Sequence, residues 1–104
     1  MAIAARAYTR QHAGEIYSVR AAAFFCVMFS RDVYQRVGPM EEAFGVGFFE
    51  DDDYCNRVRE SGFTVAVVED VFVHHHLSAS FDKLKAGKKQ ELFERNKVIY
   101  EAKW

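Results

Sequence analysis

The segment Ala21–Phe29 constrains the fold of this 104-residue chain more than any other feature of its sequence, because it is nine consecutive apolar residues. Continuous apolarity, as opposed to alternation, is typical of a strand that is buried on both faces in an α/β sheet. The segment is too short to cross a bilayer as a helix, which takes about 20 residues. We therefore predict that residues 21–29 form a central strand.

Capping and breaking residues predict the elements that follow. Ser30 can cap a short helix over residues 31–37, and Gly38 and Pro39 can end it. The further elements expected are a helix from Asp52 to Gly62, a strand over 63–68, an extended piece over 71–75, and a helix from about Leu84. Strands alternating with helices are typical of an α/β layer structure, although residues 1–20 are weakly patterned and about three strands are evident.

Two of the expected helices each carry an apolar stripe that should pack inward. On the first, Tyr54, Cys55 and Val58 lie on one face. On the last, the stripe consists of Leu92, Phe93, Asn96, Ile99 and Tyr100.

The composition excludes several classes of protein. Half of the residues are hydrophobic, which excludes intrinsic disorder. The net charge is −1, so no global basic field attracts nucleic acid or anionic membrane. We see no secretion signal and expect a cytoplasmic protein without a transmembrane segment. Cys26 and Cys55 lie in apolar settings and predict reduced, buried thiols, which also argues against a Cys–His nucleophilic pair.

Charge is segregated along the chain. Residues 41–53 hold six acidic side chains and no basic one, whereas residues 83–103 hold seven basic and three acidic ones. An acidic centre indicates a site for a cation or a hydroxyl group. The basic tail is better explained as the solvated face of a helix.

The run Phe49-Glu50-Asp51-Asp52-Asp53 is the first candidate site. Neighbouring carboxylates repel one another, so they need a cation, a helix N-terminus or hydroxyl partners. Asp52 and Asp53 are explained as favourable charges at a helix start. Asp51 follows an aromatic, glycine-containing loop, where a carboxylate screened by Phe48 and Phe49 could accept a proton from a hydroxyl group.

The triplet His74-His75-His76 is the second candidate site. On an extended chain His74 and His76 share one face and His75 lies on the other, so all three cannot bind one metal ion. A cation such as Mn²⁺ accepts mixed imidazole and carboxylate ligands.

Residues 24–81 resemble the family-two glycosyltransferases of the GT-A fold, which are inverting enzymes that use nucleotide-diphosphate sugars. Four pieces carry this resemblance, in order. They are the apolar strand with Ser30-Arg31, the turn Gly38-Pro39-Met40-Glu41-Glu42-Ala43-Phe44, the signature Phe49-Glu50-Asp51-Asp52-Asp53 with its helix to Gly62-Phe63, and the segment from Asp70 through the histidines to Phe81.

The resemblance implies a role for each matching residue. Asp51 takes the place of the base that deprotonates the acceptor hydroxyl, and Glu50 and Asp53 orient the acceptor or brace the loop. The aromatic loop containing Phe48 and Phe49 lies where acceptors bind. For the metal-associated histidine, His75 matches best and His74 is the alternative register.

The resemblance also implies what the 104 residues do not contain. The family's N-terminal nucleotide-binding half and its Asp-x-Asp metal motif have no counterpart here. We therefore expect residues 1–104 to be a single acceptor-side fragment, with a partial GT-A-like layer structure, a small mixed sheet and flanking helices. The parent enzyme would use Mn²⁺ or Mg²⁺, a nucleotide-diphospho-sugar donor, and a glycan, lipid-linked or protein acceptor. The fragment alone should be inactive, bind metal weakly and form a homo-oligomer.

Two other functions remain open from the residues. A metal-dependent hydrolase could use the Asp and His residues as ligands, and it predicts tight metal binding by the chain. A non-catalytic interaction module could use the aromatic loop and the basic helix.

Overall fold

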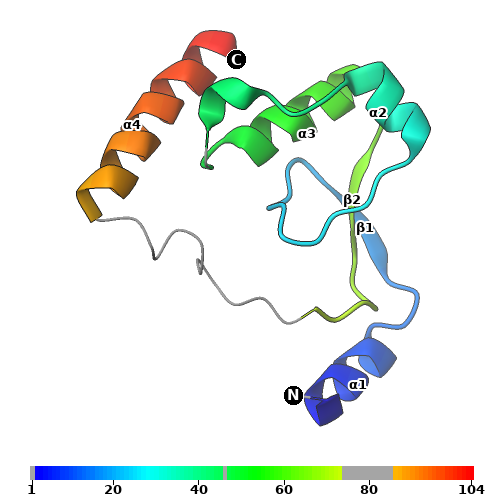
Figure 1. Cartoon of the computed structure of the whole chain (residues 1–104). Helices are drawn as coiled ribbons and strands as arrows, with labels where there is room; N and C mark the ends of the chain where they lie inside the picture. Colours follow the sequence, from blue (N-terminus) through cyan, green and yellow to red (C-terminus); the bar gives the residue numbers. More distant parts are fainter. Residues whose placement is uncertain (1, 46, 74–85) are drawn as a thin grey trace.

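The computed structural model describes residues 2–45, 47–73 and 86–104 (Figure 1). This part of the chain is a mixed α/β structure. Its elements are α1 (Ala2–Gln11), β1 (Ile16–Val19), α2 (Arg31–Val37), the 3-10 helix η1 (Glu42–Phe44), α3 (Glu50–Glu60), β2 (Val65–Val68) and α4 (Ala86–Lys103). None of the helices among these residues combines the length and the apolarity needed to cross a membrane.

The sheet consists, within the described residues, of two antiparallel strands. Ile16 of β1 lies opposite Val68 of β2, and Val19 lies opposite Val65. The prediction of a strand over 63–68 is confirmed over Val65–Val68, whereas β1 and α1 lie in the weakly patterned segment for which no element was expected. Of the expected extended piece over 71–75, residues 71–73 are not in a strand, and residues 74–75 lie outside the described part.

The prediction of a central strand over residues 21–29 is wrong. These residues form a loop with bends, and Met28, Val27 and Phe25 are exposed, Met28 by 95%. A strand that is buried on both faces needs a neighbour on each edge, and in the described sheet β2 pairs with β1 instead. The loop lies over α3, where the rings of Phe24 and Phe29 both contact the ring of Tyr54.

Helix α2 forms as its capping residues predict. The Ser30 hydroxyl accepts a hydrogen bond from the Val33 N–H at 3.3 Å. Gly38 has φ 89°, a conformation that favours glycine, and its N–H donates to the Tyr34 carbonyl at 2.7 Å. Both ends of the helix are therefore satisfied by local contacts.

The core is small and lies around α3, which is placed between α2 and α4 in Figure 1. The buried apolar residues are Phe44, Tyr54, Cys55 and Val58, so the predicted inward face of α3 is confirmed. The Tyr54 hydroxyl donates to the Gly38 carbonyl at 2.8 Å and ties α3 to the end of α2.

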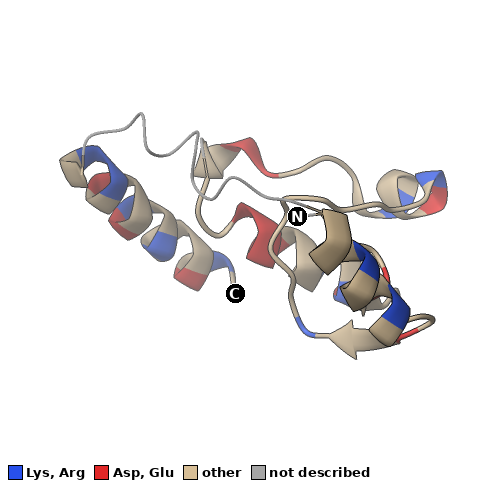
Figure 2. Cartoon of the chain, turned by 90° about the horizontal axis from the view of Figure 1, so that it is seen from below, with Lys and Arg blue, Asp and Glu red and all other residues tan. Residues whose placement is uncertain are grey.

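Helix α4 packs on η1 and α3 through its predicted stripe. Asn96 is buried, Leu92, Ile99 and Tyr100 are half-buried, and Phe93 is 37% exposed. Acidic side chains interleave with the basic ones on this helix (Figure 2). The ion pair between Lys88 and Glu91 is exposed on both sides, which fits a solvated helix face.

Helix α1 is held to the sheet by a carboxylate. The Tyr8 and Tyr17 hydroxyls both donate to the Glu69 side chain, and the Gly14 N–H donates to the Asp70 side chain at 2.9 Å. Hydrogen bonds from Tyr17 and Tyr8 lower the pKa of Glu69, and the same bonds raise the pKa of each tyrosine. We call Tyr8, Tyr17 and Glu69 the tyrosine clasp.

The tyrosine clasp predicts that the docking of α1 depends on pH. Because the pKa of Glu69 is lowered on folding, its contribution is present above its ordinary value of 4.5 and is lost as the pH falls through the lowered pKa. Because the tyrosine pKa values are raised, their contribution is present below 10.0 and is lost as the pH rises through the raised values. NMR signals of the Tyr8 and Tyr17 rings should change in both windows.

The variant Glu69→Gln removes the acid transition, since an amide does not titrate. Glu60→Gln, at an exposed carboxylate on α3, should leave it unchanged. An acid transition of the Tyr8 ring that persists in Glu69→Gln would contradict the assignment.

Candidate functional site

The aromatic loop after η1 adopts an unusual backbone conformation. Phe48 and Phe49 have φ 70° and φ 71°, and they are consecutive non-glycine residues in the left-handed region. Each such residue costs on the order of 1–3 kcal/mol and persists only where its surroundings hold it. Backbone strain of this kind is common at functional sites, and here it directly precedes the acidic first turn of α3.

That turn is the start of α3, which begins at Glu50, two positions before the expected Asp52. Phe49 stands at the N-cap position and offers no side-chain hydrogen bond. The first turn instead carries four acidic residues, whose charges interact favourably with the positive end of the helix dipole. Residues 50–53 thus stabilise the helix electrostatically where a capping side chain is missing.

Asp53 is fully buried and serves as an anchor. Its carboxylate accepts hydrogen bonds from Trp104 Nε1 at 2.9 Å and Arg57 Nε at 3.2 Å, and it forms an ion pair with Lys103 Nζ at 2.7 Å. These donors come from the end of the chain and from the next turn of α3. Asp53 does not line the pocket described next; its contacts tie the first turn of α3 to the end of α4.

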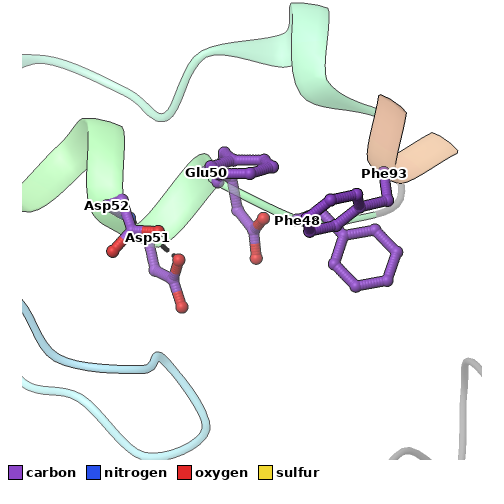
Figure 3. A pocket seen from close by; sticks show the side chains of 6 residues that line it. Phe48, Glu50, Asp51, Asp52 and Phe93 are labelled. Carbon is purple, nitrogen blue, oxygen red and sulfur yellow. Dashed lines mark hydrogen bonds between the residues drawn. The ribbon is translucent and has the colours of Figure 1, made fainter. Parts of the chain in front are cut away.

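A pocket of about 280 Å³ opens at the first turn of α3 (Figure 3). One side of it is aromatic and the other is made of carboxylates. It is lined by Phe48, Phe49, Glu50, Asp51, Asp52 and Phe93. The structure thus brings together Asp51, Glu50, Phe48 and Phe49, which the sequence singled out as site residues.

Two lining residues were not expected in the site. The sequence explains Asp52 as a charge at the helix start and places Phe93 in the inward stripe of α4. The ring of Phe93 lies 5.5 Å from that of Phe48 and 5.3 Å from that of Phe49, between centroids. Nothing in the local sequence around Phe93 signals this contact, because it depends on how α4 packs against the distant loop that contains Phe48 and Phe49.

The three carboxylates in the pocket differ in their surroundings. Two backbone N–H groups orient Asp51, from Asp52 at 2.8 Å and from Phe24 at 3.3 Å. Burial raises the pKa of Glu50, helped by the charges of Asp51 and Asp52, and its Oε2 is buried with no hydrogen-bond partner among the described residues. Burial and the charge of Asp51 also raise the pKa of Asp52.

This arrangement suits a ligand that is polar on one side and apolar on the other. Asp51 is held by two backbone N–H groups and lines the pocket, so it can accept a proton from a bound hydroxyl group. The phenyl rings offer an apolar surface opposite. Sites for small ligands commonly combine such walls with a few placed polar groups.

The proposed metal ligands His74 and His75 lie outside the described residues. Among residues 2–45, 47–73 and 86–104, no group of three or more His, Cys, Asp or Glu side chains is arranged to hold a metal ion. A second hollow of about 450 Å³ lies against α2 and is lined by Asp32, Gln35, Arg36 and Phe63. It contains a single carboxylate and none of the predicted site residues.

The two cysteines differ from each other. Cys55 is buried as predicted, whereas the prediction that Cys26 is buried is wrong. Cys26 lies in the apolar loop that was expected to be a strand, so its exposure has the same cause. Burial raises the pKa of the Cys55 thiol.

We therefore expect the two thiols to react at different rates. A disulfide reagent should modify Cys26 rapidly and Cys55 only when the structure opens, because the thiolate is the reactive form and Cys55 is both buried and harder to ionise. Cys26→Ser should retain only the slow phase, and Cys55→Ser only the fast one. Equal rates in the two single variants would contradict this prediction.

Comparison of the chain with protein-family models, with curated proteins and with solved structures found no match. The pocket and the sequence pattern around it are therefore the basis of the function proposed below.

Proposed function

We propose that this chain is the acceptor-side part of an inverting glycosyltransferase that resembles family two, with Asp51 as the general base. The observation that carries the proposal is the pocket that Asp51, held by two backbone N–H groups, lines together with the rings of Phe48, Phe49 and Phe93. This is the position that the resemblance gives to the base.

The chemistry of the pocket supports a sugar hydroxyl as the acceptor. A pyranose ring presents hydroxyl groups at its edge and C–H groups on its face. Glu50, Asp51 and Asp52 can accept hydrogen bonds from the hydroxyl groups, while the phenyl rings of Phe48 and Phe93 offer an apolar surface for the ring face.

The shape of the chain supports a larger catalytic domain. The radius of gyration is 16.0 Å, compared with about 13 Å for a folded domain of 100 residues. Many large apolar side chains are exposed, among them Met28, Phe25 and Val71. We infer that a nucleotide-binding half covers part of this surface, and that the isolated chain associates with itself.

The proposed mechanism is a single displacement. Asp51 takes the proton of the acceptor hydroxyl while its oxygen attacks the anomeric carbon, on the face opposite the nucleotide diphosphate. The carbon–oxygen bond to the diphosphate breaks as the new glycosidic bond forms, and the configuration inverts. In the parent enzyme Mn²⁺ or Mg²⁺ would neutralise the leaving diphosphate; the described residues do not form a site for it, and no step here depends on one.

The test is a transfer assay on a protein in which this chain follows a nucleotide-binding half. NMR of the product with a panel of nucleotide-diphospho-sugars and glycan acceptors should show the inverted anomer. Transfer with retained configuration would overturn the single displacement. Failure of all donors, combined with tight Mn²⁺ or Zn²⁺ binding to the 104-residue chain in calorimetry, would favour the metal-dependent hydrolase instead.

A further inference from the structure

Asn96 is the one fully buried residue of α4 within the described part, and it is polar. Its Nδ2 donates to the carbonyl oxygens of Phe44 at 2.7 Å, Gly47 at 2.5 Å and Phe48 at 3.0 Å. An amide nitrogen carries two hydrogens, so three acceptors converge on two donors. We call this arrangement the amide clamp.

The amide clamp acts on the segment that leads into the pocket. Its three carbonyls span the end of η1 and the first of the two left-handed residues. Carbonyls that turn inward need donors, because leaving a buried one unpaired costs about 1–3 kcal/mol. Asn96 therefore offsets the strain of Phe48 and Phe49 with hydrogen bonds that exist only when this loop is folded inward.

Other side chains of α4 also contact the loop that contains Phe48 and Phe49, on either side of Asn96 in the sequence. The ring of Tyr100 stacks on that of Phe49, with 5.3 Å between centroids, and Phe93 contacts both phenylalanines. Arg95 donates from Nε and Nη2 to Asn96 Oδ1 at 3.3 Å, which orients the amide so that its NH₂ faces the carbonyls. The buried amide sits at the centre of this contact.

We propose that Asn96 is the positioning residue of the pocket: by clamping the carbonyls of Phe44, Gly47 and Phe48, it holds the left-handed Phe48–Phe49 pair and aims Asp51 into the pocket. Phe49 is the residue before α3, so its backbone angles set the direction in which the first turn starts. The role of Asp51 as a base rests on the proposed function, whereas the clamp does not.

The test on the chain itself uses Asn96→Ala with Asn56→Ala as the matched control. Asn56 also joins α3 to α4, through a hydrogen bond from Nδ2 to the Tyr100 hydroxyl at 2.8 Å, and it donates to none of the carbonyls of residues 44, 45 and 47–49. In Asn96→Ala the ¹³Cα and ¹³Cβ shifts of Phe48 and Phe49 should lose their left-handed signature. The pKa values of Glu50 and Asp52 should fall towards ordinary values as the turn opens. Asn56→Ala removes only the hydrogen-bond partner of Tyr100, so it should keep the left-handed ¹³Cα and ¹³Cβ signature of Phe48 and Phe49 even where the Phe49 ring signals shift. An unchanged left-handed signature in Asn96→Ala would overturn the proposal.

A measurement on the unmodified chain covers the case in which Asn96→Ala does not fold. A long-range NMR experiment should detect couplings through the hydrogen bonds from the Asn96 side-chain nitrogen to the carbonyl carbons of Phe44, Gly47 and Phe48. Rapid solvent exchange of the Asn96 amide protons, without such couplings, would refute the clamp.

Kinetics separate the clamp from the proposed reaction. In the transfer assay Asn96→Ala should lower kcat about 10²-fold, the scale of a misplaced group, with the donor KM unchanged. Adding Asn96→Ala to Asp51→Asn should lower kcat no further, because the clamp acts through Asp51. A further loss in the double variant would overturn positioning of Asp51. If Asp51→Asn has no effect, the proposed function fails while the NMR result still decides the clamp.

Discussion

Replacing Asp51 with Asn is expected to lower sugar transfer by roughly 10²–10⁴-fold, the range for loss of a general base. The amide has the shape of the carboxylate and its oxygen can still accept the N–H of Asp52, so the first turn of α3 should keep its conformation, whereas the amide NH₂ cannot accept the N–H of Phe24 and that bond is lost. It cannot take a proton from the acceptor hydroxyl. The measurement is kcat in the transfer assay, on the protein that combines this chain with its nucleotide-binding half.

Two control measurements distinguish loss of the base from a general loss of activity. Donor binding should be nearly unchanged in Asp51→Asn, because the donor lies outside this pocket in the proposed mechanism. Asp32→Asn, at an exposed carboxylate of α2, should retain full turnover. If Asp51→Asn keeps more than about a tenth of the turnover, where base removal predicts far less, Asp51 is not the base.

Phe44→Ala is expected to destabilise the chain by about 3–5 kcal/mol, the usual cost of removing a buried phenyl ring. Phe44 is fully buried where η1 meets α4, and its carbonyl belongs to the amide clamp. Small domains have unfolding free energies of about 5–15 kcal/mol in total. Phe44→Ala should therefore remove a large part of the stability, and urea unfolding would measure it.

Met28→Ala is the control, because Met28 is also a large apolar residue but is 95% exposed. Surface substitutions usually change stability by less than about 0.5 kcal/mol. Similar urea midpoints for Phe44→Ala and Met28→Ala would show that the packing around η1 does not stabilise the chain. A large loss in Met28→Ala would instead show that its side chain is buried in solution, as it would be in a self-associated chain.

Much of the fold was predictable because its signals are local. Ser30 begins α2 and Gly38 ends it, each through a hydrogen bond to a residue within the same helix. The stripes of α3 and α4 follow the helical period, and Tyr54, Cys55 and Asn96 are buried as that period predicts. The grouping of Glu50 and Asp51 with Phe48 and Phe49 was also predictable, since these residues are neighbours in the chain.

The apolar run shows where local signals fail. Residues 21–29 have the composition of a central strand, but a strand exists only through its partners, and β2 pairs with residues 16–19 instead. The segment containing Ile16 carries no comparable apolar signal. Sheet pairing is a contact between distant residues, so the run by itself could not decide it.

The amino-acid sequence alone determined α2, α3 and α4, the inward faces of α3 and α4, and the acidic turn with its aromatic loop, because hydrogen bonds and periodicity within a few residues decide them. Only the tertiary structure decided which carboxylate became an anchor and which faces the pocket. Asp53 is buried because Lys103 and Trp104 reach it from the far end of the chain, and Asp51 is oriented in part by Phe24. Asn96 and Phe93 joined the site for the same reason, since the return of α4 to the loop brings their side chains into contact with residues 44–49.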